Sequence, residues 1–403
     1  MIDISKAIKI IGNKTGTLSS ERVDLAASVG RVLRENIIAD TDLPPFDRSQ
    51  MDGFAVIAAD TLPKPERSKN IVLNIVGESA AGRGWHKTMK AGEAVRIMTG
   101  APVPKGADAI QKIELTSETK NGIVTIIEAT EKGRFIVRKG SEIKKSHTIF
   151  KVGEVITHNM IATLAAFGCA KVKVTKRPKV AILGTGSEIV AINKKPKRDQ
   201  IRNSNSVMLD VLCREFGAET KIFPISKDER ADLRSQISDA VKNTEILVIT
   251  GGVSVGKYDL TKAVLLELGA EIFFDTVRLK PGKPMVFARV GKTLVFGLPG
   301  NPVSAAVTFH LFVRKAILAM QSASTTGLRK GFAVVAADAK AARERDTYLP
   351  SQLETNKMGQ LVAHPLKWQG SSDFIGYARA DSLVFVSKGS TIKKGEVANI
   401  VFL

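Results

Sequence analysis

Short glycine-rich segments that also carry hydroxyl and carboxylate side chains are the part of this sequence best suited to chemistry. Gly184, Thr185, Gly186 and Ser187 precede Glu188, while Thr250 precedes Gly251, Gly252, Ser254 and Gly256. Consecutive backbone N–H groups in glycine turns form concave sites for anions, and neighbouring hydroxyls add donors. Neither segment matches the phosphate-binding pattern G-x-x-x-x-G-K-[ST] or the dinucleotide pattern G-x-G-x-x-G. A purely structural turn would explain one such segment. Since two of them follow strand-like runs at the same edge of one sheet, we expect them to bind an anionic ligand, although not through either of those motifs.

Two lysines supply positive charge in a third segment, Lys280-Pro281-Gly282-Lys283-Pro284. The prolines and the glycine make a stiff loop, and lysine is a compact cationic ligand for phosphate. The alternative is a turn at the start of a strand with solvated lysines. A fourth segment contains Pro299, Gly300, Asn301, Pro302 and Ser304. It follows a strand and opens a long helix, so that backbone N–H groups and the helix dipole attract an anion there.

Three carboxylates, those of Glu188, Asp228 and Asp259, lie near the expected strand ends. Carboxylates beside phosphate-binding loops commonly hold Mg²⁺, which prefers oxygen ligands and bridges to phosphate oxygens. A helix cap is the alternative interpretation for Asp228. The five histidines show no paired ligand spacing, which argues against a zinc site. A nucleophile elbow of the kind that hydrolases use is also absent.

Three further segments give weaker signals. Asp52, before Gly53, either begins a turn of a linker or presents a carboxylate to a site. Thr99, before Gly100, is able to offer a hydroxyl and an N–H group to an oxyanion, although this motif is weak alone. The densest charge run, Lys194-Lys195-Pro196-Lys197-Arg198, is either a solvated loop or an anion-binding loop.

The elements that position these segments alternate between strand and helix. We expect strands over 179–183, 221–224, 246–250, 271–274, 284–289 and 293–296, with helices over 205–215, 228–241, 258–268 and 301–320. Alternation at this spacing indicates a doubly wound, mostly parallel α/β domain, the last two strands forming a hairpin. In such sheets ligands bind beyond the carboxyl ends of the strands. The glycine-rich segments all fall at those ends.

The rest of the chain divides around that domain. A helix is expected after Asp3, which would cap it, with Ile4, Ala7, Ile8 and Ile11 on its buried face, and another helix over 154–168. The predicted organisation is a discontinuous mixed helical and linker domain (1–44 and 139–176), a β-rich insert domain (45–138), the α/β domain (177–327) and a small C-terminal β domain (328–403).

Composition narrows the class of protein. The 403 residues are 44% hydrophobic and 25% charged, as in a soluble globular protein of several domains. The sequence shows no uninterrupted apolar run long enough for a spanning helix, no secretory signal and only two cysteines, so a cytoplasmic enzyme is expected. A net charge of +20 favours anionic ligands. Only 5% of residues are aromatic, which gives no obvious platform for stacking nucleic-acid bases.

Taken together, the segments resemble one family. PPFDRSQMDGFAV, RIMTGAPVPKGADAI, AILGTGSEI, NSNSVML, TGGVSVGKYD, KPGKPMVFA and GLPGNPVSA occur in the order found in the molybdopterin molybdenumtransferases, relatives of the C-terminal part of gephyrin. The resemblance covers about residues 40–310, and the terminal β region fits more loosely. It implies insertion of molybdate into adenylylated molybdopterin, with Mg²⁺-dependent release of AMP.

The resemblance also implies roles for individual residues. Asp52, Thr99, Glu188, Asp228 and Asp259 resemble active-site positions, and the three last would bind the metal. Lys280, Lys283, Ser254, Ser304, Arg345 and Ser371 resemble an oxyanion-binding set, with Arg343 and Ser372 as rivals for the last two. Glu142, counted with the catalytic positions, stands where the family usually has aspartate. Relatives form homodimers, so Asp52 and Thr99 are expected to act in the partner subunit's site.

Other functions remain open from the sequence. The preceding adenylylation of molybdopterin is performed by an enzyme that shares the α/β domain and is a possible partner, but the 45–138 insert and the terminal β domain argue against that activity here. A molybdopterin-binding scaffold without turnover is a second alternative, motivated by Glu142. A nucleic-acid binder is a third, motivated by charge alone and by no recognition motif. We expect neither nucleic acid nor a membrane as a partner.

Overall fold

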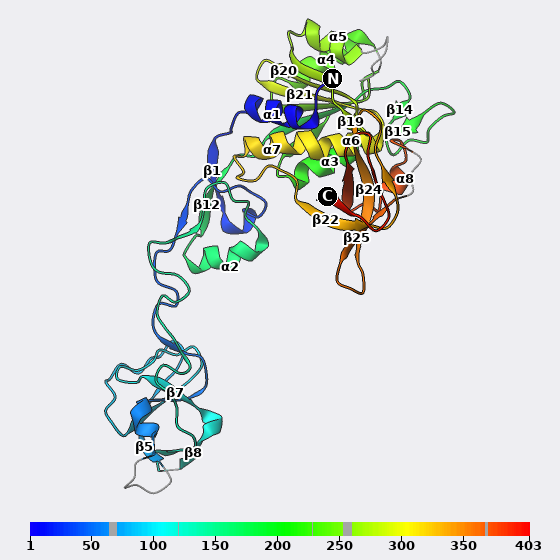
Figure 1. Cartoon of the computed structure of the whole chain (residues 1–403). Helices are drawn as coiled ribbons and strands as arrows, with labels where there is room; N and C mark the ends of the chain where they lie inside the picture. The colour runs from blue at the N-terminus through cyan, green and yellow to red at the C-terminus, as the bar shows by residue number, and fades with distance from the viewer. Residues whose placement is uncertain (64–70, 120, 228, 253–259, 367–369) are drawn as a thin grey trace. The chain divides into compact units, whose positions relative to one another are not determined.

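The chain forms two compact units in the computed structural model, which describes residues 1–63, 71–119, 121–227, 229–252, 260–366 and 370–403 (Figure 1). The first unit contains residues 1–35, 152–165 and 169–403, and the second contains residues 36–151 with 166–168. The finer division into four domains remains a prediction.

A six-stranded sheet forms the centre of the first unit. Its order is β16 (Glu219–Ile222), β13 (Lys179–Gly184), β17 (Ile246–Thr250), β21 (Thr293–Leu298), β20 (Pro284–Val290) and β18 (Glu271–Thr276). The first four strands are parallel to one another, β20 is antiparallel to β21, and β18 is antiparallel to β20, so that only β20 runs against the other five. The mostly parallel sheet and the terminal hairpin are therefore confirmed. The strand expected over 221–224 begins earlier, at Glu219.

Both faces of this sheet are covered, as in a doubly wound layer. In β17, Ile246 and Val248 belong to one buried cluster, while Leu247 and Ile249 belong to the other. The first cluster includes residues of α1 (Ile4–Lys14), α3 (Ser204–Glu215), α6 (Pro302–Thr308) and α7 (Arg314–Met320); the second includes residues of α4 (Arg230–Ala240) and α5 (Leu260–Glu267). Because successive side chains of a strand point to opposite faces, a strand apolar throughout requires cover on both sides.

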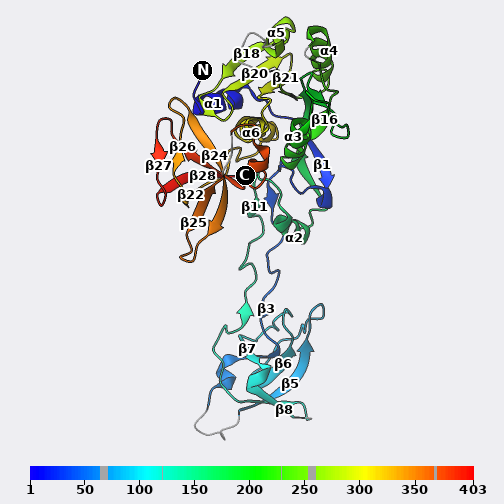
Figure 2. The same ribbon diagram turned by 90° about the vertical axis from the view of Figure 1, so that its right-hand side faces the viewer.

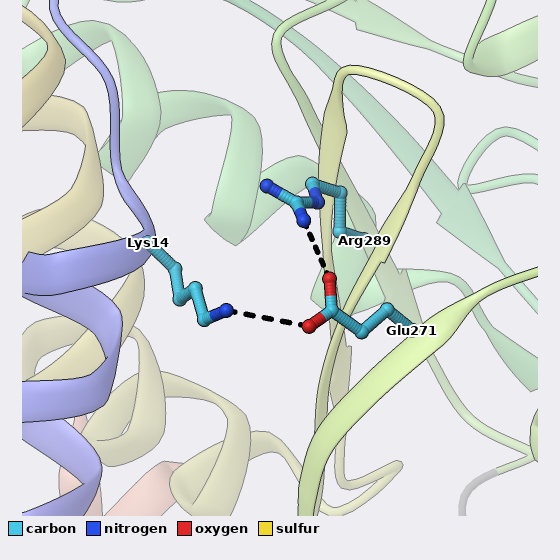
Figure 3. A network of polar contacts seen from close by, with 3 residues as sticks. All are labelled: Lys14, Glu271 and Arg289. Carbon is cyan, nitrogen blue, oxygen red and sulfur yellow. Dashed lines mark hydrogen bonds and ion pairs between the residues drawn. The ribbon is translucent and has the colours of Figure 1, made fainter.

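The first helix packs beside α7 and reaches β18, the last strand of this sheet, through an ion pair. Ile4, Ala7 and Ile11 of α1 are buried, as expected from their spacing. The ammonium of Lys14 lies 3.3 Å from one carboxylate oxygen of Glu271, whose other oxygen accepts from Arg289 (Figure 3). Asp3 occupies the N-cap position, but its carboxylate makes no capping hydrogen bond. The carboxylate instead accepts from Arg278, so the expected capping role is wrong.

The predicted helix over 301–320 is present but is not uniform. A π-helical segment, Phe309–Val313, separates α6 from α7. His310 in this segment is 6% exposed and packs edge-on against Phe216 and Phe309. Burial, together with the nearby charge of Arg314, lowers the pKa of His310 to about 4. Among the described residues one stretch, Pro302–Met320, is long and apolar enough to cross a membrane, but 83% of it is buried within the protein, as in a core helix.

Two helix starts differ from expectation. The helix predicted over 154–168 is α2, His158–Ala166, and it follows the bridge between Val155 and Val32 that holds the preceding residues extended. The helix α4 begins at Arg230 with Glu229 at its N-cap position, and Asp228 itself lies outside the described residues. A short ribbon of β1 (Ser20–Asp24) and β12 (Lys171–Thr175) completes this part of the unit.

The C-terminal region is a closed barrel. Its strands are β22 (Lys330–Val335), β24 (Asp346–Thr355), β25 (Leu361–Pro365), β26 (Ser382–Val386) and β28 (Val397–Phe402), and β24 also pairs with the short β19 (Leu279–Lys280). Pairing of β24 with both β25 and β26 closes the ring. Shorter pieces are β23 (Ala339–Lys340), β27 (Thr391–Ile392) and α8 (Phe374–Tyr377). Figure 2 shows the barrel beside α6, whose residues share the large buried cluster with Tyr348, Leu383 and Val401.

The second unit is built on another six-stranded sheet. Its order is β7 (Ala109–Lys112), β4 (Gly53–Val56), β6 (Glu93–Ile97), β5 (Ile71–Ser79), β9 (Ile123–Ile126) and β8 (Thr116–Thr119). Phe54 and Val56 are buried on one face and Ala55 on the other. Two small ribbons, β2 (Ile37–Ile38) with β11 (Thr148–Phe150) and β3 (Arg48–Ser49) with β10 (Ile136–Val137), lie outside this sheet. The β-rich insert predicted for this region is present.

Candidate functional site

Three parallel strands of the first unit end at the same level. Gly184 of β13 pairs with Thr250 of β17, and Thr250 pairs with Leu298 of β21. The three glycine-containing loops that follow these strands therefore start side by side at one edge of the sheet. The sequence predicted this arrangement from the rule that ligands bind beyond the carboxyl ends of parallel strands.

Hydrogen bonds hold the three loops against each other. The backbone N–H of Thr185 donates to the carbonyl of Thr250 at 2.9 Å. The side-chain amide of Asn205, in the first turn of α3, donates to Thr250 Oγ1 at 2.9 Å and to the carbonyl of Gly300 at 2.7 Å. Thr250 Oγ1 in turn donates to the carbonyl of Pro299 at 3.3 Å. Asn205 thus connects the ends of β17 and β21 through a single side chain.

Close approach of the loops explains two of the glycines. Gly251 has φ +92, and a Cβ on it would lie 2.2 Å from the carbonyl oxygen of Thr185. Gly252 has φ +62, and its Cβ would lie 2.7 Å from Thr185 Oγ1 and 2.8 Å from Thr261 Oγ1. L side chains rarely adopt such φ values, and here the space is filled as well. The two glycines let the backbone of one loop lie directly on the next.

Several buried polar atoms at this edge have no hydrogen-bond partner among the residues that the structure describes. They are Thr185 Oγ1, Asn205 Oδ1, Ser206 Oγ and Thr261 Oγ1. Thr185 is 2% exposed, and Ser206 and Thr261 are fully buried. Buried polar groups are almost always hydrogen-bonded, so unsatisfied ones gathered at one place indicate capacity for a polar ligand.

A cleft of about 840 Å³ opens at this edge, a size within the usual range for small-molecule sites. Of the predicted residues, Thr185, Glu188, Gly251, Gly300, Asn301 and Pro302 line it, as do Thr250 and Ser372. Pro196 of the basic run also lines it, and the lining residues for which the sequence indicated no role are Ile189, Ile192, Gln200, Ile201, Arg202, Asn203, Ser204, Asn205 and Phe374. The lining residues come both from the α/β layer and from the C-terminal region, because β14 (Ile189–Val190) and β15 (Ile201–Arg202) lie near α8 (Figure 1).

The long helix begins at this cleft. Asn301 is its N-cap residue and Pro302 its first residue, and both line the cleft. The side-chain amide of Asn301 donates to Ser371 Oγ at 2.8 Å, and the backbone N–H of Val303 donates to the carbonyl of Ser371 at 3.1 Å. Ser371 therefore supports the helix start, while its rival Ser372 faces the cleft. Ser304 is buried within α6 and does not line the cleft.

Lys280 and Lys283 lie at the same sheet edge but do not line the cleft. β20 is antiparallel to β21, with Val286 opposite Gly297. The first residue of β20, Pro284, therefore lies at the end of the sheet where β21 ends, and the loop that carries the two lysines directly precedes it. Lys280 pairs with Thr347 in β24, and Arg345, two residues before Thr347, directly precedes that strand. Among the described residues none of these three cations has an ion-pair partner within 4.0 Å. Their charge is available to an anion, and Arg343 is the more exposed of the two rival arginines.

In the second unit Asp52 and Thr99 are in direct contact. One carboxylate oxygen of Asp52 accepts the backbone N–H of Thr99 at 2.7 Å and its hydroxyl at 3.0 Å. Glu142 forms an ion pair with Arg48 at 3.1 Å, and Arg48 bridges to Pro102 on the loop that follows Thr99. The three predicted residues of this unit therefore gather around one loop.

The described residues leave the predicted metal site incomplete. Glu188 is exposed in the cleft, but Asp228 and Asp259 lie outside the described residues, as do Ser254 and Gly256. In the part of the chain that the structure describes, no three His, Cys, Asp or Glu side chains form a group able to hold a metal ion. The magnesium site remains a prediction that rests on one placed carboxylate. The carboxylate of Glu188 lies directly against the backbone of Gly186. A Cβ on Gly186 would lie 2.5 Å from Glu188 Oε2, so the glycine leaves room for the carboxylate in this position.

Comparison with known proteins gives a consistent result along the chain. Three family models match: the MoeA N-terminal region (domain I and II) over residues 2–168, a probable molybdopterin binding domain over 181–319, and the MoeA C-terminal region (domain IV) over 333–403.

Similar proteins cover almost the whole chain. A molybdopterin molybdenumtransferase of Staphylococcus aureus is 33% identical over 99% of this chain and 95% of its own, and one of Haemophilus influenzae is 30% identical over 94% and 93%. Among solved structures, a molybdopterin biosynthesis MoeA protein of Pyrococcus horikoshii OT3 matches with a TM-score of 0.85 and 27% identity over 100% of both chains. A molybdopterin biosynthesis MoeA protein from Pyrococcus horikosii, in a separate structure, matches with a TM-score of 0.80 and 30% identity over 100% of this chain and 99% of that one.

Proposed function

The chain belongs to the MoeA family of molybdopterin molybdenumtransferases, and on that premise we propose that it inserts molybdate into adenylylated molybdopterin and releases AMP. The single observation that carries the proposal is the convergence of the loops after β13, β17 and β21 on one cleft. Backbone N–H groups, a helix start, the unsatisfied hydroxyl of Thr185 and the unsatisfied amide oxygen of Asn205 meet there. These groups suit a phosphate-bearing ligand better than a neutral one.

Two anions that repel each other must be held at once in this reaction. We assign the cleft to the phosphate-bearing pterin, with Thr185, Gly251 and Asn301 among its contacts. Lys280, Lys283 and Arg345 would hold molybdate, since they are cations at the same sheet edge without ion-pair partners among the described residues. Preorganised cations cost no rearrangement when charge must be stabilised, which is the usual source of rate enhancement in such sites.

Mg²⁺ would be held by Glu188 together with Asp228 and Asp259, and when bound it would draw charge from the phosphate oxygens as the bond to AMP breaks. The exposed carboxylate of Glu188 in the cleft supports this assignment. The role of the chain is to keep this carboxylate at the rim of the cleft, and the Gly186 turn does so.

Three finer expectations belong to the same proposal. Asp52, Thr99 and Glu142 would complete the active site of the partner subunit in a homodimer. The enzyme would receive its substrate from the adenylyltransferase of the preceding step. It would work in the cytoplasm, in agreement with a core helix as the sole candidate span among the described residues.

The test is a reaction of purified protein with adenylylated molybdopterin, molybdate and Mg²⁺, with AMP measured by chromatography. We expect AMP release that stops when molybdate is omitted or when EDTA is added. Glu188→Gln should reduce the rate at least about tenfold, since it removes a charged metal ligand. Glu215→Gln, the same change at an exposed site on α3, should leave the rate unchanged.

Three results would point elsewhere. ATP consumption without molybdate would indicate the adenylylation step. Tight molybdopterin binding with no turnover, even after Glu142→Asp, would indicate a scaffold. Salt-sensitive binding of DNA in competition with molybdopterin would indicate a nucleic-acid binder.

A further inference from the structure

The loop between β14 and β15, residues 191–200, carries the densest positive charge of the chain, and the function proposed above leaves this charge without a role. Lys194, Lys195, Lys197 and Arg198 are all exposed, and Asp199 follows them. The sequence is compatible with two interpretations of this run, a solvated loop and an anion-binding loop. The surroundings of the individual side chains distinguish them.

Strand pairing and hydrogen bonds from neighbouring side chains hold the loop in shape. β14 pairs with β15, Ile189 opposite Ile201, and the guanidinium Nε of Arg202 donates to the carbonyl of Lys194 at 3.1 Å. The backbone N–H of Lys197 donates to Oε1 of Gln200 at 3.1 Å. The backbone N–H of Ile201 also donates to the carbonyl of Glu188 at 2.9 Å. The base of the basic loop is therefore fixed to the turn that carries the cleft carboxylate.

Half of the basic loop faces a second cavity. A pocket of about 430 Å³ is lined by Ser187, Glu188, Lys197, Arg198, Asp199 and Gln200. Glu188 and Gln200 also line the main cleft, so that the pocket continues the cleft past the carboxylate. Lys194 and Lys195 are in the same loop but do not line this pocket.

Opposite charges share the pocket without neutralising each other. Lys197 and Arg198 stand beside Glu188 and Asp199, yet among the described residues none of these four side chains forms an ion pair within 4.0 Å. A ligand that carries both signs suits such a lining. A phosphate complexed with a divalent cation does, because the metal offsets the carboxylates while the phosphate oxygens accept from the cations.

We propose that this pocket is a phosphate subsite of the cleft, in which Lys197 and Arg198 bind a phosphate of the nucleotide part of the substrate as its magnesium complex. The proposal rests on the function proposed above, since it divides one substrate between the main cleft and its extension. In this arrangement the two cations select the adenylylated form of the pterin. They do so because the pterin without the nucleotide has only its own phosphate, which the main cleft holds, and lacks the nucleotide phosphate that would occupy the pocket.

The test is the affinity of the full-length protein for AMP in the presence of Mg²⁺, measured by isothermal titration calorimetry. A salt concentration of about 0.15 M is suitable, because it screens charges beyond about 8 Å. Lys197→Ala with Arg198→Ala should weaken AMP binding at least about tenfold, the loss expected for removing charge-assisted hydrogen bonds. Lys194→Ala with Lys195→Ala is the matched control. It removes the same charge from the same loop and should change the affinity less than about threefold.

A charge-preserving variant, Lys197→Arg with Arg198→Lys, should bind AMP nearly as well as the original protein. Equal losses of AMP affinity in the two double-alanine variants would overturn the proposal. They would show that AMP responds to the overall positive charge of the loop and not to a specific subsite. Unchanged affinity in both pairs would overturn it too, and would leave the loop solvated. The measurement needs no turnover. Loss of AMP binding only in the 197/198 pair, in a protein that fails to use molybdate, would therefore refute the proposed function and leave the subsite standing.

Discussion

Asn205 offers the sharpest test of whether the cleft depends on contact between the loops. Asn205→Asp keeps the size of the side chain but replaces the amide donor by an acceptor. The native amide donates to Thr250 Oγ1 at 2.9 Å and to the carbonyl of Gly300 at 2.7 Å. With aspartate, the Thr250 hydroxyl is able to turn and donate to the carboxylate, but it then gives up its bond to Pro299. The carbonyl of Gly300 has no donor left and faces a negative charge.

The cost follows from this exchange of partners. Each lost hydrogen bond is worth about 1 kcal/mol net, and a carbonyl against a carboxylate adds a similar repulsion. We therefore expect the loop at Gly300 to lose about 2 kcal/mol of its anchoring. If the loop must be in place for the reaction, kcat/KM for adenylylated molybdopterin falls about 30-fold, since 1.4 kcal/mol corresponds to a factor of ten.

The assay is AMP release at saturating molybdate, combined with urea unfolding of the same samples. Asn243→Asp is the control, because Asn243 is exposed and precedes β17, at the edge of the sheet opposite the cleft. It adds the same charge and should leave kcat/KM within about twofold. Unchanged kcat/KM in folded Asn205→Asp protein would refute the argument that this side chain positions the loops. The same conclusion would follow if the control lost as much activity as the variant.

Three other substitutions test separate parts of the structure. Gly251→Ala should lower the free energy of unfolding by several kcal/mol in urea titrations, because its Cβ would lie 2.2 Å from a backbone oxygen. Gly269→Ala is the control, since Gly269 has φ +75 but open space around it, and it should lower the free energy of unfolding by only about 1–2 kcal/mol. Equal losses in the two variants would contradict this reasoning. Lys280→Ala should raise KM for molybdate about tenfold in the AMP-release assay, while Lys292→Ala, exposed in the β20–β21 turn, should leave it unchanged. Burial lowers the pKa of His310 to about 4, so the unfolded chain binds a proton at this residue more tightly than the folded chain does. The free energy of unfolding should therefore fall by on the order of 3 kcal/mol as the pH drops from about 6.5 towards 4. Thermal unfolding at a series of pH values measures this loss, and His310→Phe should flatten the profile over that range.

Local pattern was a good guide wherever burial on the sheet dictates the residue type. The strand 246–250 was predicted with the bounds that β17 has, because a strand covered on both faces is apolar throughout and ends where glycines begin. Pattern was a poor guide in the C-terminal barrel. β24 (Asp346–Thr355) went unpredicted, and Pro350 within it is a residue that argues against a strand. It is tolerated here because its backbone faces the β25 side, where its carbonyl accepts from Leu366 and the ladder with β25 begins only at Ser351, so that no ladder hydrogen bond needs its missing N–H. Which strands β24 pairs with is a choice that local sequence does not encode.

The candidate site likewise contains residues whose role local sequence indicates and one whose role it does not. Thr185, Gly251, Gly300 and Asn301 were found from sequence because glycine, hydroxyl and helix-start chemistry is written in adjacent residues, and a parallel sheet brings such loops to one edge. Asn205 was read only as the start of a helix, since nothing in a helix pattern tells which strand ends its amide will reach.

The sequence by itself determined the chemistry: which loops can bind an anion, where the cations and carboxylates stand along the chain, and the α/β layer that carries them. Tertiary structure alone decided which of these groups share a cavity. Lys197 and Arg198 line the pocket beside Glu188 while Lys194 and Lys195 of the same run do not, and Ser371 supports a helix start while Ser372 faces the cleft. The reason is physical. Residue type and local spacing set what a side chain is able to do, but its neighbours across the fold come from register and packing between segments far apart in the chain.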